Sequence, residues 1–114
     1  MNQHTIKKKV TLKGVGLHTG KAVKMTFLPA PINHGYKFQR VDLEDQPIIN
    51  VDANKVCSTN RSTTLKSGEA SVATVEHALS ALAGLSIDNV LVQIDGPEVP
   101  IMDGSAAEFV KVLA

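Results

Sequence analysis

The segment VATVEHALSALAGL, residues 72–85, decides the order of secondary structure in this 114-residue chain. Four of its apolar side chains recur at steps of three and four residues, the spacing of one helix face: Val72, Val75, Leu79 and Leu82. Gly84 stands where such a helix would end. We therefore expect a helix over residues 72–85, in contrast to the alternating pattern that precedes it.

Alternation of apolar and polar residues before this segment predicts half-buried strands. The clearest alternation lies at residues 6–12 and 23–28, which we expect to pair in antiparallel fashion. Shorter candidates lie at residues 36–41 and 48–51, whereas residues 57–65 predict an irregular segment or a short hairpin. The part of the chain before the helix is therefore expected to form a sheet.

A connection with three glycines in seven residues, GVGLHTG at residues 14–20, joins the first two of these strands. Glycine permits the backbone conformations of tight turns and bulges, so we expect a tight or bulged hairpin connection that leaves His18 exposed. Glycine also permits the close approach of a ligand. The residues alone leave both interpretations open.

After the helix, residues 89–95 form an apolar run that predicts a central strand buried on both faces. The connection GPEVPIMDGS, residues 96–105, is constrained by two prolines and two glycines. Ser105 and Glu108 then have the spacing of a capping box at the start of a second helix. The expected fold is α+β, a two-layer domain with a mostly antiparallel sheet packed against two helices.

Composition limits the class of protein. A hydrophobic content of 43% over 114 residues is enough for one core and too little for two ordinary domains. No apolar run approaches the roughly 18 residues that span a bilayer, and the N-terminus lacks the apolar core of a signal peptide. The single cysteine, Cys57, excludes an internal disulfide and a multi-cysteine zinc site, so we expect a soluble, cytoplasmic protein.

The charges are divided unevenly along the chain. Eight basic residues, ending with Arg40, precede the first acid, Asp42, and the remaining residues carry four basic and eleven acidic side chains. A basic N-terminal third suits an anionic partner such as nucleic acid, so a small α+β interaction or nucleic-acid-binding module is one alternative. A purely structural oligomerisation domain is another. With only 4% aromatic residues, no stacking platform for bases is evident, and solvent-facing lysines on strands are the simpler interpretation.

Glu76 and His77 place a carboxylate beside an imidazole where core packing requires neither. On a helix running from residue 72, His77 points away from the apolar face, and its neighbours one turn away are all small: Ala73, Thr74, Ser80 and Ala81. Adjacent helical residues diverge by about 100°, so the two side chains cannot easily bind one metal together. They can divide the work, with His77 binding a divalent metal and Glu76 acting as general base.

The chain supplies no evident partners for such a metal. A catalytic zinc usually has three protein ligands, and the other histidines show no ligand spacing: His4, His18 and His34. An exposed Glu-His pair on a helix is more commonly a solvated surface. Asp103 is likewise expected to be a turn or cap residue and Cys57 a small buried side chain.

Four segments, taken in order, resemble the N-terminal half of UDP-3-O-acyl-N-acetylglucosamine deacetylase: residues 14–20, residues 71–82 with Thr-Val-Glu-His, residues 87–89 and residues 97–106. The resemblance implies a zinc-dependent amidase of lipid A biosynthesis that removes the N-acetyl group from a UDP-linked, acylated glucosamine. It also implies two similar α+β domains with the metal between them. Residues 1–114 would be the N-terminal domain, and the C-terminal domain would lie outside this chain.

The resemblance assigns roles to individual residues. His77 resembles the one zinc ligand supplied by the first domain, and Glu76 resembles the catalytic base. Two short segments resemble walls of the substrate cleft, the second in an insert that departs from commoner members: Leu17, His18 and Thr19, and Asn60, Arg61 and Ser62.

The absent domain would supply the remaining zinc ligands, which are a His and an Asp on one helix. It would also supply a further His that acts as general acid. We therefore expect this chain alone to bind zinc weakly and to be inactive. Any membrane contact would be peripheral, through the lipid substrate.

Overall fold

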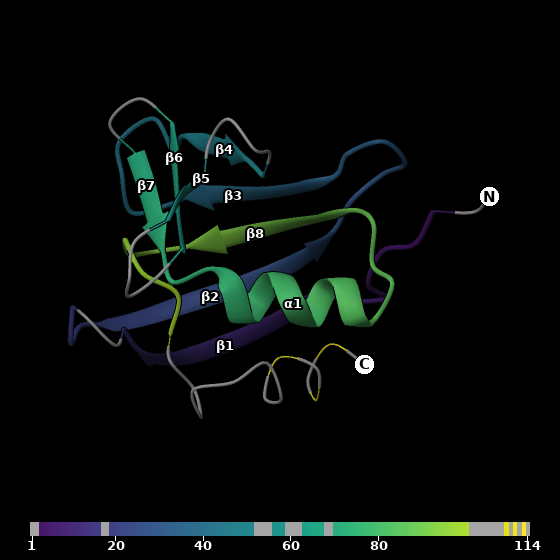
Figure 1. The fold of residues 1–114 in the computed structure, drawn as a ribbon, viewed down its shortest axis with the longest axis horizontal. Coiled ribbons are helices and arrows are strands. Elements are labelled where there is room, and N and C mark those ends of the chain that lie inside the picture. The colour runs from purple at the N-terminus through teal and green to yellow at the C-terminus, as the bar shows by residue number, and fades with distance from the viewer. Residues whose placement is uncertain are drawn as a thin grey trace.

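The computed structural model describes residues 3–16, 19–51, 56–58, 63–67 and 70–100, together with residues 109, 111 and 113. In chain order its elements are β1 (Val10–Val15), β2 (Ala22–Pro29), β3 (Tyr36–Arg40), β4 (Ile48–Asn50), β5 (Val56–Ser58), β6 (Thr63–Ser67), β7 (Ala70–Ala73), α1 (Glu76–Gly84) and β8 (Val90–Ile94) (Figure 1). The α+β class expected from the sequence is confirmed.

The strands form two sheets. The larger has the order β1-β2-β8-β3-β4, and the smaller has the order β5-β6-β7. Neighbouring strands are antiparallel except that β3 and β8 run parallel, so the larger sheet is mostly antiparallel. β8 lies at its centre, as expected from the apolar run. Val90, Val92 and Ile94 on one face are fully buried, and the residues between them are half-buried.

The core lies between the larger sheet and α1. The helix contributes Ala78, Ala81 and Leu82 to the same buried cluster as Phe27 of β2. The ring of Phe27 meets the ring of Phe109 edge-on, with centroids 6.4 Å apart at 69°. Such aromatic pairs add stability beyond the area that they bury.

The C-terminal segment contributes to this core. Phe109 and Leu113 are buried and, with Lys111, are helical, which agrees with a second helix. Its expected capping residues, Ser105 and Glu108, lie outside the described part of the chain. In the part that is described, no helix has the length and apolar character needed to span a membrane.

The N-terminal boundary of the sheet differs from the expectation. β1 begins at Val10 rather than at residue 6, because the chain bends at Lys7 and Lys8. Ile6 is nevertheless buried, and Thr5 makes a single parallel bridge to Asn89. Residues 3–6 thus form a strap beside Asn89, just before the start of β8, so Ile6 is buried without belonging to β1. Of the two alternatives expected for residues 57–65, the structure has the hairpin, formed by β5 and β6.

The start of the helix was also predicted wrongly. α1 begins at Glu76, whereas residues 70–73 form β7 and Val75 occupies the N-cap position. Val72 is buried because it lies on the inner side of β7, so its spacing from Val75 imitated a helix face. Ala73 and Thr74 therefore precede the helix, and of the four small neighbours expected around His77 only Ser80 and Ala81 belong to α1.

Candidate functional site

Glu76 and His77 form the first turn of α1. Both side chains are half-buried, so neither is packed into the core. The N-terminal end of a helix carries partial positive charge from unpaired amides, and an acid in the first turn is stabilised there. The structure thus presents an imidazole beside a carboxylate at a helix start, with both accessible from solvent.

Thr74 turns the chain from β7 into this helix. Its φ angle is 62°, in the left-handed region that a β-branched residue rarely adopts. Such a conformation costs on the order of 1–3 kcal/mol and persists only when surrounding contacts hold it. Contacts beyond Thr74 itself must therefore fix the direction in which α1 begins.

The loop after β8 supplies those contacts. It descends from the end of β8 to lie beside the end of β7 (Figure 1). The amide of Ala73 donates to the carbonyl of Pro97 at 2.8 Å, and the amide of Val99 donates to the carbonyl of Ala73 at 3.0 Å. The last residue of β7 is therefore held on both sides by this loop.

Glu98, in the same loop, connects the segments around the site. Its side chain is only 1% exposed. The hydroxyl of Thr74 donates to Oε2 of Glu98 at 2.8 Å, and the amide of Thr19 donates to Oε1 at 2.9 Å. A buried carboxylate requires such donors to offset its desolvation. One acid thus joins the start of the Glu-His helix to the glycine-rich turn.

Gly16 makes room for this arrangement. A Cβ atom at this position would lie 2.4 Å from Oε1 of Glu98 and 2.5 Å from the hydroxyl of Thr19. The amide of Gly16 donates to the carbonyl of Lys21 at 3.0 Å, and Gly20, with φ +68°, donates to the carbonyl of Gly16 at 3.0 Å. The glycines therefore serve a tight turn packed against the buried acid.

The remaining predicted site residues are only partly described. Thr19 is exposed at its side chain while its amide contacts Glu98. The other cleft residues lie outside the described part of the chain: Leu17, His18, Asn60, Arg61 and Ser62. Asp103 also lies outside it, as does the side chain of Cys57, whose backbone belongs to β5.

Glu98 was not among the residues expected at the site. A signal existed in the sequence, because an acid stands between Pro97 and the apolar pair Val99 and Pro100. Both members of that pair are buried, and Glu98 is buried with them. A sequence pattern cannot reveal its contacts with Thr74 and Thr19, which lie 24 and 79 residues away.

A metal would need ligands beyond these residues. Among the described residues, no group of three or more His, Cys, Asp or Glu side chains is placed to hold a metal ion. His77 and Glu76 fit part of a site, an accessible imidazole with a neighbouring carboxylate. The other histidines whose placement is described make different contacts: His4 lies 3.7 Å from Asp88, and His34 contacts the carbonyl of Gly35 at 2.9 Å.

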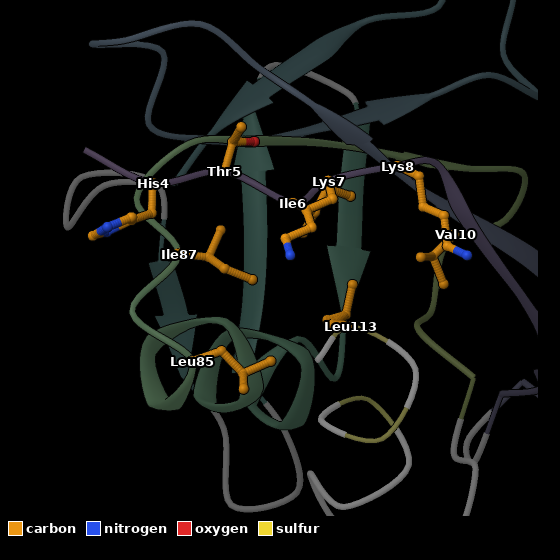
Figure 2. A pocket seen from close by; sticks show the side chains of 9 residues that line it. All are labelled: His4, Thr5, Ile6, Lys7, Lys8, Val10, Leu85, Ile87 and Leu113. Carbon is orange, nitrogen blue, oxygen red and sulfur yellow. The ribbon is translucent and has the colours of Figure 1, made fainter. Parts of the chain in front are cut away.

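One cavity lies beside the Glu98 loop, and a larger one lies at the opposite end of α1 from Glu76 and His77. One, of about 240 Å³, is lined by Glu98 and Thr19 together with Lys21 and Asp95. The larger, of about 510 Å³, lies between the N-terminal strap, the residues that follow α1, and Leu113 (Figure 2). Neither Glu76 nor His77 lines the larger cavity, so its size does not make it the catalytic site.

Comparisons with known proteins identify relatives along the whole chain. A family model described as UDP-3-O-acyl N-acetylglycosamine deacetylase matches residues 3–114. The bifunctional enzyme LpxC/FabZ of Porphyromonas gingivalis is 55% identical over 109 residues, which are 96% of this chain and 24% of that protein. The UDP-3-O-acyl-N-acetylglucosamine deacetylase of Geobacter sp. strain M21 is 52% identical over 112 residues, 98% of this chain and 37% of that protein.

A third relative extends the match to every residue. The deacetylase of the same name from Trichormus variabilis is 50% identical over 114 residues, 100% of this chain and 41% of that protein. The chain therefore spans between 24% and 41% of the length of these three curated relatives.

Proposed function

The chain belongs to the UDP-3-O-acyl N-acetylglycosamine deacetylase family, and we propose that residues 1–114 form the N-terminal domain of such an enzyme. The reaction proposed is removal of the N-acetyl group from a UDP-linked, 3-O-acylated N-acetylglucosamine in lipid A biosynthesis. The observation that carries the proposal is the Glu76-His77 pair, half-buried at the start of α1 within a chain that matches this family over its length.

Glu76 is proposed as the general base. As a water oxygen bonds to the acetyl carbonyl carbon, the Glu76 carboxylate accepts the proton that the water loses. The carbon–nitrogen bond then breaks, and the sugar amine leaves with a proton supplied by an acid outside this chain. The products are acetate and the free amine.

His77 is proposed as one ligand of a zinc ion, through a neutral ring nitrogen. When bound, zinc supplies a Lewis acid that polarises the amide carbonyl. The described residues offer this imidazole without a complete ligand set, so the other ligands are assigned to a second domain. By itself, the segment 1–114 is proposed to bind zinc weakly and to lack turnover.

The substrate is proposed to contact two segments of the chain. The first contains Leu17, His18 and Thr19, and the Thr19 amide is held by the acid that also contacts Thr74. The second contains Asn60, Arg61 and Ser62. The basic N-terminal third is a secondary source of attraction for the substrate phosphates. A cytoplasmic location, with peripheral membrane contact through the acyl chain, completes the proposal.

The comparisons do not favour the alternative of a nucleic-acid-binding module. Its basic residues include Lys13 and Lys24, which lie opposite each other on β1 and β2 and are exposed. This is the arrangement of lysines on the solvent side of a strand pair. Any oligonucleotide affinity should be weak and should fall steeply with salt.

The proposal is tested on the complete gene product by measuring deacetylation together with bound zinc. Glu76→Gln should lower kcat by about 100-fold or more while zinc content is retained. His77→Ala should lower both activity and zinc content, because a ligand is lost. The matched controls are Glu44→Gln and His4→Ala, which alter an exposed acid and an exposed histidine elsewhere. Wild-type turnover in both site variants would refute the proposal.

A second experiment tests the assignment of the missing ligands. Residues 1–114 expressed alone are compared with the complete gene product for zinc affinity and deacetylation. We expect weak zinc binding and background turnover from the fragment, with a folded circular dichroism spectrum. Full activity from the folded fragment would show that the site is contained within it.

A further inference from the structure

We propose that Glu98 is a positioning residue that couples the glycine-rich turn to the first turn of α1. The Glu98 carboxylate holds the amide of Thr19 with one oxygen and the hydroxyl of Thr74 with the other. These contacts set the position of the proposed substrate turn relative to Glu76 and His77. The catalytic consequence rests on the proposed function, whereas the coupling itself rests on the geometry alone.

Glu98 is almost completely buried. An acid that is 1% exposed needs partners that compensate for lost water, and here they come from two segments far apart in sequence. Backbone contacts reinforce the arrangement, since Ala73 forms a bridge with Glu98 and Gly16 forms one with Pro100. The loop that carries Glu98 is thus held between the two segments that it connects.

α1 begins without a side-chain cap. Helices commonly start with a Ser, Thr, Asp or Asn side chain that accepts a bond from a backbone amide of the first turn. The N-cap residue here is Val75, and no side chain caps the helix. The nearby hydroxyl of Thr74 donates instead to Glu98. The helix start is therefore set by a long-range contact rather than by local capping.

The backbone of Thr74 is strained. A β-branched residue at φ 62° would relax if its side chain were not held. The bond to Glu98 and the burial of the side chain hold it two residues before Glu76. A substitution of Glu98 should therefore let the backbone of Thr74 relax, and the positions of Glu76 and His77 should change with it.

The test uses the complete gene product carrying Thr74→Val, Thr74→Ser or Glu98→Gln. Valine keeps the shape of threonine and removes the donor, whereas serine keeps the donor. Thr26→Val is the matched control, because it removes a hydroxyl that pairs with Thr11 on an exposed part of the sheet. Each variant is assayed for kcat and KM well below its melting temperature, so that the folded protein is compared.

We expect Thr74→Val and Glu98→Gln to lower kcat about 10- to 100-fold, the range typical of residues that orient a catalytic group. Thr74→Ser should recover most of the wild-type kcat, and Thr26→Val should not change it. Independently of activity, the Thr19 amide proton should shift upfield in Glu98→Gln and should move in Thr74→Val, as measured by NMR. Movement of the Thr19 resonance in Thr74→Val supports coupling through Glu98.

Wild-type kcat in both Thr74→Val and Glu98→Gln overturns the inference, even if the melting temperature falls. So does a Thr19 resonance that Thr74→Val leaves in place. If Glu98→Gln does not fold, the Thr74 variants still decide the matter. The proposed function fails separately, when Glu76→Gln and His77→Ala turn over like wild type. In that case the Thr19 resonance still shows whether Glu98 couples the two segments.

Discussion

The hydroxyl of Thr74 lies 2.8 Å from the carboxylate of Glu98, and both side chains are buried although they are 24 residues apart in sequence. This contact fixes the point where β7 gives way to α1. The first two residues of that helix, Glu76 and His77, are the proposed base and metal ligand. The direction of the site therefore depends on a loop that contributes no proposed catalytic residue.

Gly16→Ala should destabilise the fold by about 1–3 kcal/mol, the usual cost of forcing atoms into a packed region. The new Cβ would meet Glu98 Oε1 at 2.4 Å and the Thr19 hydroxyl at 2.5 Å. Urea denaturation measures the change. Gly84→Ala is the matched control, because apart from its chain neighbours and the backbone of its own helix no atom lies within 4 Å of its Cβ position. It should stabilise the helix by about 0.4–1 kcal/mol. Equal effects of the two substitutions would contradict the packing at Gly16.

Asp42 should contribute stability that is lost in acid. The side-chain hydrogen bond from Arg40 lowers the pKa of Asp42 below its usual value, against a smaller opposing effect of burial. A lowered pKa in the folded state stabilises the protein above the unfolded pKa of about 3.9, and this contribution disappears as pH falls through the folded value. Asp42→Asn should therefore reduce stability at neutral pH and flatten its dependence on pH below about 5.

Unfolding free energies measured across this acid range check the prediction. Arg40 also donates to the carbonyl of Ser71 in β7 at 2.8 Å, so its guanidinium links the two sheets and should stay ordered. Asp45→Asn, an exposed acid in the same connection, serves as the control. If Asp42→Asn and wild type lose stability in parallel as the pH falls, the ion pair does not stabilise the fold.

Tyr36 should ionise above its ordinary range. Burial, and secondarily the negative charge of Asp88, raise the pKa of Tyr36, whose hydroxyl donates to the carbonyl of Ile87. Because the folded state holds the proton more tightly, this contribution to stability is present below pH 10 or so and is lost as pH rises through the folded pKa. The phenolate absorbance difference between wild type and Tyr36→Phe isolates this titration. A midpoint at or below about 10 would contradict the burial of this hydroxyl.

The strands with alternating sequence could be predicted because one face of each strand packs in the core and the other faces solvent. In β2, Val23, Met25 and Phe27 are buried, and alternation alone identifies them. The start of α1 was not predictable in this way. Val72 and Val75 are buried for different reasons, one within β7 and one at the helix cap, yet their spacing matches a helix.

Site residues that are adjacent in the chain could be predicted from the sequence, whereas contacts between distant segments could not. Glu76 and His77 are adjacent in the chain, so a general base and a metal ligand could be proposed from these two residues alone. Glu98 acquires its role only through pairing across 24 and 79 residues. The strained φ angle of Thr74 likewise follows from tertiary contacts, and the residues next to Thr74 in the sequence do not predict it.

The most direct test of the central claim is the rate at which the complete gene product releases acetate from UDP-3-O-acyl-N-acetylglucosamine, compared between Glu76→Gln and Glu44→Gln. We expect a loss of about 100-fold or more in kcat for the first variant and wild-type kcat for the second. Equal and undiminished rates from both variants would contradict the claim.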